Sequence, residues 1–301
     1  MTDYSQQTGK GIAYGVAAYI TWGINIFYFK WVAHVSAPEV LAHRIIWSVF
    51  FLAVVLLLKK QIAPTIQACR DKKTLLFLAG STILIAANWL QFIWAIANNR
   101  ILDTSLGYFI NPLLNIVLGF VFLRERFRKM QILCVALAFI GVAFQTYSHG
   151  HVPMLSLGIA FTFGFYGLLR KQTPLASIPG LAAETVLLFP FALGYLFYLN
   201  TQNSLVFLHL DLRTDLLLPL AGFITSLPLI WFANAAKRLR YSTIGFLTYI
   251  SPSLTFIFAV TIYHEPLGTA RFISFIFIWT ALIIYSIDMY FHEKKSRRVS
   301  N

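Results

Sequence analysis

Four ionisable residues lie within or at the ends of long apolar runs of this chain: Lys30, His43, Arg44 and Glu184. A charged group in hydrocarbon is costly, so each of them needs a reason to be there. The planar guanidinium of Arg44 could bind a carboxylate or a phosphate through two hydrogen bonds. Its alternative roles are an ion pair with Glu39 or snorkelling to the interface. We predict a substrate-binding or gating role for the four residues.

Two of these residues also have a simpler interpretation. Lys30 ends its apolar run, so its ammonium group could snorkel to water instead of meeting a substrate. His43 could be a packing residue held by a hydrogen bond, although its imidazole also suits a gate.

Glu184 is predicted to lie at a different depth from the His43–Arg44 pair, because its apolar run starts from the other side of the membrane. The separation would be on the order of 15 Å in a hydrocarbon core about 30 Å thick. The two groups could then close opposite gates or bind the two ends of a zwitterion. As a carboxyl group in an apolar helix, Glu184 could also exchange a proton, so we predict proton coupling there.

A second set of polar and aromatic residues is predicted to line the same site. Tyr108, Asn111 and Asn115 are spaced to share one face of a helix. Lipid would penalise the two amides, so this face should look into the bundle. Polar side chains also hold membrane helices together without any substrate, which is the alternative. The predicted lining residues are Asn88, Trp94, Tyr108, Asn111, Tyr249 and Ser251.

Two prolines are predicted to break helices beside this set. Pro112 and Pro252 each remove a backbone hydrogen bond and free a carbonyl nearby. Discontinuous helices at related positions of two halves are a sequence signal for a carrier site.

Composition places these residues in a membrane protein. Hydrophobic residues make up 58% of the 301-residue chain, charged residues make up only 12%, and mean hydropathy is +0.70. A soluble domain carries about 25% charged residues. The net charge of +13 is divided among short clusters between apolar runs, a pattern of membrane topology that argues against nucleic-acid binding.

Ten apolar runs are long enough to cross a bilayer, which takes about 20 residues. The expected spans are Gly11–Trp31, Pro38–Leu58, Thr74–Ala97, Thr104–Leu123, Met130–Tyr147, Pro153–Leu169, Gly180–Leu199, Leu216–Ala236, Thr243–Tyr263 and Thr269–Tyr290. With ten helices, nearly all Lys and Arg residues outside the spans fall on one side together with both termini. The positive-inside rule makes that side cytoplasmic. We expect a multi-pass protein of a bacterial inner membrane.

The chain also contains an internal repeat. A shift of 140 residues aligns Ala95 with Ala235, Ile110 with Ile250, Pro112 with Pro252, Leu114 with Leu254 and Glu125 with Glu265. The predicted units are residues 1–150 and 151–301. Each holds five helices, an odd number, so the second must insert upside down. Inverted repeats are a common plan of secondary carriers.

The run Asn88–Gly141, which contains SLGYFINPL at Ser105–Leu113, resembles the RarD-type branch of the EamA transporters in the drug/metabolite transporter superfamily. TWG at Thr21–Gly23 and HRIIWS at His43–Ser48 are similar as well. The resemblance covers nearly the whole chain. It implies two inverted five-helix repeats, cytoplasmic termini and transport of small organic solutes.

Taken together, these features predict a secondary transporter that works by alternating access on an amino acid, a metabolite or an amphiphilic drug. A channel or a non-transporting scaffold is the main alternative, and an intramembrane enzyme using His43, Arg44 and Glu184 is a weaker one. We expect no enzyme activity, no cofactor and no metal. The expected partners are the lipid bilayer, a small-molecule substrate and, through the fifth and tenth spans, a second copy in a homodimer.

Overall fold

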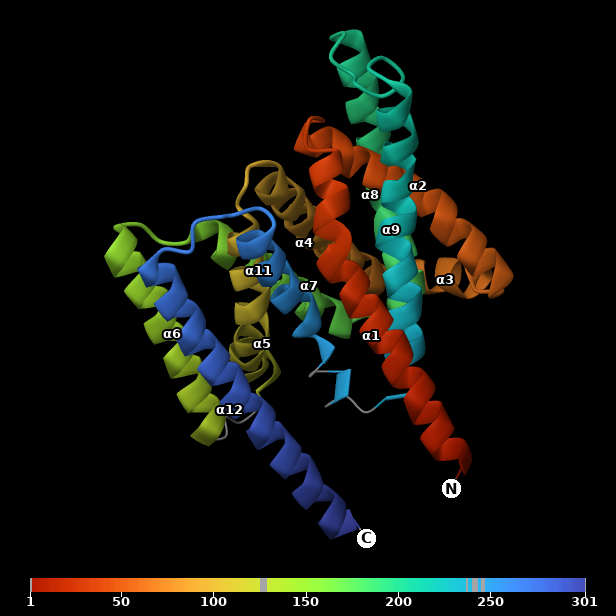
Figure 1. Cartoon of the computed structure of the whole chain (residues 1–301). Coiled ribbons are helices and arrows are strands. Elements are labelled where there is room, and N and C mark those ends of the chain that lie inside the picture. Colours follow the sequence, from red (N-terminus) through yellow and green to blue (C-terminus); the bar gives the residue numbers. More distant parts are fainter. Residues whose placement is uncertain (1, 125–128, 237, 240–242, 245–246, 301) are drawn as a thin grey trace.

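The computed structural model describes residues 2–124, 129–236, 238–239, 243–244 and 247–300 (Figure 1), and within these ranges every regular element is an α-helix. The helices are α1 (Thr2–Trp31), α2 (Ala37–Leu58), α3 (Ile62–Cys69), α4 (Lys72–Ala97), α5 (Ile101–Leu123), α6 (Lys129–His149), α7 (Met154–Lys171), α8 (Ser177–Thr201), α9 (Leu212–Ala236), α11 (Ile250–Thr261) and α12 (Thr269–Ser300). Glu125 and parts of the basic clusters at 124–129 and 237–240 lie outside the described residues.

Eight of the described helices are long and apolar enough to cross a membrane: α1, α2, α4, α5, α6, α8, α9 and α12. The protein is therefore a multi-pass, all-helical membrane protein. The 18-residue helix α7 and the 12-residue helix α11 coincide with expected spans, but neither is both long and apolar enough by itself to count as a membrane-crossing helix.

Most expected spans agree with these helices to within four residues at each end. The exceptions are the N-terminal end of α1 and the C-terminal end of α12, which extend beyond the apolar runs, and the expected span Thr243–Tyr263, where the helix break predicted at Pro252 is wrong in position. A turn at Thr248 and Tyr249 interrupts it, and α11 begins only at Ile250. Pro252 then occupies the first turn of α11, where a missing N–H is tolerated.

The predicted helix break at Pro112 is also wrong, because α5 is one continuous α-helix on both sides of it. Proline removes one hydrogen bond, and packing against α7 and α11 holds the helix together.

The short helix α3 was not anticipated, because its eight residues are too few to span a bilayer. It lies between two basic segments and ends just before Asp71. The Asp71 carboxylate accepts hydrogen bonds from the amide and hydroxyl of Thr74, which caps α4 and holds the pKa of Asp71 below its ordinary value.

The helices pair across the two halves of the chain more than within them. Helix α1 packs on α9 and α11, while α7 packs on α4 and α5. Helix α2 packs on α8 and α9, and α6 packs along α12. The N- and C-termini lie at one end of the molecule, and the α8–α9 connection lies at the other (Figure 1).

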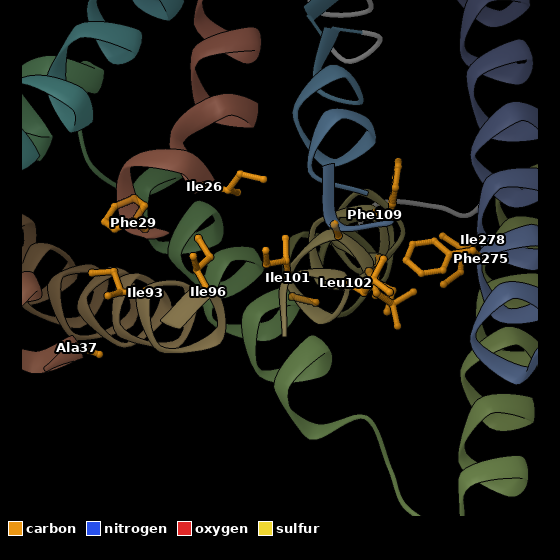
Figure 2. Packing of buried hydrophobic residues seen from close by; sticks show 14 of the residues in the cluster. Ile26, Phe29, Ala37, Ile93, Ile96, Ile101, Leu102, Phe109, Phe275 and Ile278 are labelled. Atoms are coloured by element: carbon orange, nitrogen blue, oxygen red, sulfur yellow. The ribbon is translucent and has the colours of Figure 1, made fainter. Parts of the chain in front are cut away.

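Buried apolar side chains form two clusters. The first joins α1 to α5, α6 and α12, and Figure 2 shows Ile26 and Phe29 at one end of it and Phe275 and Ile278 at the other. The second joins α2 to α4 and α8 through Ile45, Trp89 and Leu181, among others. The chain therefore has two cores.

Close helix packing depends on small residues. A Cβ at Gly107 would lie 2.7 Å from the Ser156 carbonyl oxygen, and one at Gly23 would lie 2.8 Å from the Leu254 Cβ. A Cβ at Gly222 would press on the backbone of Trp47, where α9 crosses α2. Gly residues at such positions allow two helix backbones to approach each other.

We predict that Gly222→Ala destabilises the protein by about 1–3 kcal/mol, because the backbone of α2 would have to move to admit the methyl group. The matched control is Gly194→Ala in α8, where a Cβ has nothing within 4 Å. Thermal unfolding in detergent should show a lower midpoint for Gly222→Ala alone. Equal midpoints for both variants would contradict the proposed close contact.

Candidate functional site

Arg44 is the centre of a group of aromatic side chains between α1, α2 and α4. Its guanidinium carbon lies 4.1 Å from the centre of the Trp89 ring and 5.6 Å from that of Phe29. The side chains of Tyr28 and Tyr108 lie near enough for an electrostatic interaction. Phe29 belongs to the first apolar cluster and Trp89 to the second, so Arg44 lies where the two cores meet.

Asn88 ties three helices together beside this group. Its amide nitrogen donates to the Ile159 carbonyl and to the Thr162 hydroxyl of α7, both at 3.0 Å. Its amide oxygen accepts from the Tyr108 hydroxyl of α5 at 3.1 Å. Asn88 is 1% exposed, so water does not replace these bonds. These hydrogen bonds fit a residue that holds membrane helices together, and they also fit one that lines a site.

Asn111 repeats this arrangement further along α5. Its amide nitrogen donates to the Ala160 carbonyl of α7 at 3.1 Å, and its oxygen accepts from Asn115 at the same distance. Asn111 is buried and faces the bundle interior, whereas Asn115 is exposed, so the expectation that both amides face inward holds for Asn111 alone. A third link joins α5 to α11, because the Ser105 hydroxyl donates to the Pro252 carbonyl at 2.9 Å.

His43 faces a different direction from Arg44. Its Nδ1 accepts from the Trp47 indole at 3.3 Å, and its ring lies 4.6 Å from that of Phe207 in the α8–α9 connection. His43 is 1% exposed, and its Nε2 has no hydrogen-bond partner among the described residues. The imidazole thus packs against the α8–α9 connection and not against the Arg44 group.

Glu184 forms a second polar centre that joins α8 to α4 and α7. It is fully buried, and its Oε1 accepts from the Ser81 hydroxyl at 2.6 Å and lies 3.5 Å from Nε of Arg170. Its Oε2 accepts from the Tyr166 hydroxyl at 3.2 Å. Arg170 ends α7 and also donates to the Ala176 carbonyl just before α8. The guanidinium passes over Gly180, where a Cβ would clash with it.

The other predicted residues are not brought to Arg44 by the contacts of the described chain. Lys30 donates to the Asn99 side chain and lies 5.1 Å from the Tyr263 ring centre. Trp94 is 42% exposed and packs under Arg100.

The two residues predicted on the ninth span also face elsewhere. Tyr249 hydrogen-bonds to Ser286 of α12. The backbone of Ser251 lies against Gly23 in α1.

Three further buried carboxylates, Glu39, Asp103 and Glu265, lie at the ends of apolar runs. Glu39 and Glu265 are named in the sequence analysis without these contacts, and Asp103 is not named there. Glu39 accepts from the amides of Val206 and Phe207 at 2.9 and 3.1 Å. Glu265 accepts from the amides of Ile101 and Leu102 at 2.6 and 2.8 Å and so caps α5. The suggested Arg44–Glu39 ion pair is absent from the described part of the chain.

Asp103 is the third of these carboxylates. It pairs with Arg100 at 2.8 Å and with Arg271 of α12 at 3.4 Å. Its alignment between two arginines could not be read from the sequence, since Arg271 is distant along the chain.

These features define a membrane protein with a polar, charged interior. A family model described as the EamA-like transporter family matches residues 9–147. Protein RarD of Salmonella typhi is 44% identical over 97% of this chain and 99% of its own length. Protein RarD of Escherichia coli strain K12 is 43% identical over 98% and 99%. A Bacillus subtilis protein named uncharacterized transporter YojE is 38% identical over 98% of both chains.

The chain belongs to the EamA transporter family, in its RarD group. It is a membrane transporter of the drug/metabolite superfamily, and the family and two of its relatives are named as transporters, which are not enzymes. A solved crystal structure with 14% sequence identity covers 92% of this chain and 96% of its own, with a TM-score of 0.58. That likeness concerns the fold alone.

We predict that Asn88→Ala destabilises the protein by about 1–3 kcal/mol, because it leaves buried groups on α5 and α7 without a partner. The control is Asn98→Ala, whose exposed amide donates only to the Trp94 carbonyl of its own helix. Its cost should stay below about 0.5 kcal/mol. Thermal unfolding of both variants measures the difference, and equal stability would show that the Asn88 hydrogen bonds contribute nothing.

Proposed function

We propose that this transporter is a secondary carrier that moves a small organic solute across a bacterial inner membrane by alternating access. Its working parts are two inverted five-helix repeats, residues 1–150 and 151–301. The first repeat comprises α1, α2, α4, α5 and α6. The second comprises α7, α8, α9, the span that ends in α11, and α12. Both termini lie in the cytoplasm.

Equivalent helices of the two halves begin at equivalent positions, which supports the repeat. Helices α2 and α8 begin at Ala37 and Ser177, and α6 and α12 begin at Lys129 and Thr269; both pairs are 140 residues apart. The same shift relates α4 and α9, which begin at Lys72 and Leu212. It equals the shift that aligns the sequence identities.

The observation that best supports the proposal is that the first helix of each repeat packs against helices of the other repeat. Helix α1 of the first repeat packs on α9 and α11 of the second, and α7 of the second packs on α4 and α5 of the first. The repeat relates α1 to α7, α4 to α9 and α5 to α11, so these two arrangements are equivalent. Inverted repeats that interlock in this way can exchange conformations, which opens a central site to one side and then the other.

Buried carboxylates at the connections supply the contacts that would open and close. On the cytoplasmic side Glu184 joins α8 to Arg170 and Tyr166 of α7. On the outer side Glu39 holds the α8–α9 connection and Glu265 holds the start of α5. A carrier must break the contacts on one side of the membrane while those on the other side stay intact, so that the site never opens to both sides at once.

The partners that fit this arrangement are the lipid bilayer and the solute. The relatives come from bacteria, and the basic clusters fit a cytoplasmic face. Helices α6 and α12 pack along each other and expose apolar side chains such as Phe139 and Ile283, which lipid or a second copy would cover.

Counterflow distinguishes a carrier from a channel. Liposomes containing the purified protein are loaded with an unlabelled solute and diluted into labelled solute, across a panel of amino acids, organic acids, nucleosides and amphiphilic antibiotics. We expect one class to show transient accumulation of label and saturable uptake. Flux that follows the gradient without accumulation would instead indicate a channel.

Glu184→Gln tests proton coupling at the cytoplasmic gate. For the solute that shows counterflow, we expect an imposed pH gradient to stimulate wild-type uptake but to have no effect on the variant, because an amide cannot exchange a proton. Counterflow itself should persist. Asp71→Asn, which keeps a capping oxygen on an exposed residue, is the control. A variant with the wild-type response to the gradient would exclude Glu184 from coupling.

A further inference from the structure

Arg44 differs from Arg100, Arg170 and Arg271 in what its guanidinium contacts. Arg100 and Arg271 both reach the carboxylate of Asp103, and Arg170 reaches that of Glu184. In the described part of the chain Arg44 has no ion pair, and its buried Nε has no hydrogen-bond partner. Arg44 is half-buried among apolar side chains, and a cation without an anion is costly there, so its retention calls for a binding partner from outside the chain.

The contacts that Arg44 does make leave its hydrogen-bond donors free. It interacts with the rings of Trp89 and Phe29, as a guanidinium does when it stacks on aromatic faces. The five N–H groups of a guanidinium lie in its plane and point away from a ring stacked on it. The side chain is therefore held in place by aromatic packing while its planar fork remains available to a carboxylate.

The internal repeat shows what is missing at this position. The 140-residue shift places Arg44 opposite Glu184, and Lys30 opposite Arg170. In the second repeat the cation at the end of the first helix, Arg170, is neutralised by the carboxylate of Glu184. In the first repeat both positions are cationic. A carboxylate brought by the solute would supply there the charge that Glu184 supplies on the cytoplasmic side.

The surroundings of Arg44 also limit the solute. The described residues near it add the aromatic side chains of Tyr28, Phe29, Trp89 and Tyr108, and they include no second cation for a doubly charged phosphate. The hydroxyl of Tyr28 is engaged with the Leu217 carbonyl, and that of Tyr108 with Asn88. No carboxylate of the described residues is paired with Arg44 or stands beside it to receive an ammonium group.

We infer that Arg44 binds the carboxylate of an organic monocarboxylate whose apolar, ring-sized body lies against Phe29, Trp89 and Tyr108. This inference rests on the proposed function, because it assigns the class of solute that the carrier moves. Amino acids, nucleosides and sugar phosphates are disfavoured as solutes, since each brings charges or polar groups without a partner at this site.

Calorimetric titration of the purified full chain in detergent tests this assignment. The probes are 3-phenylpropionate, its neutral amide 3-phenylpropanamide and the zwitterion phenylalanine, at a neutral pH where the acid is ionised. We expect the wild-type protein to bind the acid at least about tenfold more tightly than the amide or phenylalanine, as a charge-assisted hydrogen-bonded pair requires. Arg44→Gln should reduce this preference to about one. The exposed Arg213→Gln is the matched control and should keep it.

Equal binding of acid and amide by the wild type, or an acid preference that survives in Arg44→Gln, would overturn the inference. If Arg44→Gln fails to fold, Arg44→Lys provides the test, because an ammonium keeps the charge but not the fork. Its affinity for the acid should fall about three- to tenfold with that for the amide unchanged. Unchanged affinity for the acid would also overturn the inference.

Counterflow of 3-phenylpropionate separates this inference from the proposed function. Binding that depends on Arg44 without any counterflow would contradict the carrier and leave the anion site standing. Counterflow of a neutral or zwitterionic solute, with no Arg44-dependent binding of the acid, would support the carrier and overturn the anion site.

Discussion

The cost of placing charge in a bundle surrounded by lipid governs this structure. Little water is available to solvate a buried carboxylate, so Asp103 and Glu184 are stable only with partners within the fold. Asp103 is paired with Arg100 and Arg271, and Glu184 with Arg170. The Asp103–Arg271 pair joins helices distant in the sequence, and the Glu184–Arg170 pair joins two consecutive helices, so both support the packed state. In the proposed carrier they are also contacts that a conformational change would break.

Backbone groups are subject to the same constraint. The connections between helices would expose unpaired amides at the membrane boundary, and buried side chains supply acceptors to them. Glu265 accepts from the start of α5, and Glu39 from the α8–α9 connection. Each carboxylate lies on one element and holds another. The ends of the bundle are thus closed by specific hydrogen bonds that can exchange, and not by apolar packing alone.

Against this pattern of satisfied charges, the two halves of the chain are not equivalent. Positions 140 residues apart hold Glu184, which is paired with Arg170, and Arg44, which meets only aromatic rings where the two apolar cores join. In the proposed carrier, the related halves would exchange conformations. The different charges at positions 44 and 184 would give the two halves different chemistry.

The sequence by itself determined the membrane setting and most helix bounds, because hydrophobic length depends on composition alone. It also singled out Arg44, Asn88 and Glu184 as polar groups within apolar runs; their functional roles stay predictions. It failed at Pro112 and at the ninth span, where neighbouring helices decide whether a helix continues. Only the tertiary structure decided which buried charges are paired, and it separated Lys30, Trp94 and Tyr249 from Arg44. Partners such as Arg170 and Arg271 come from other helices, so packing and not local sequence places them.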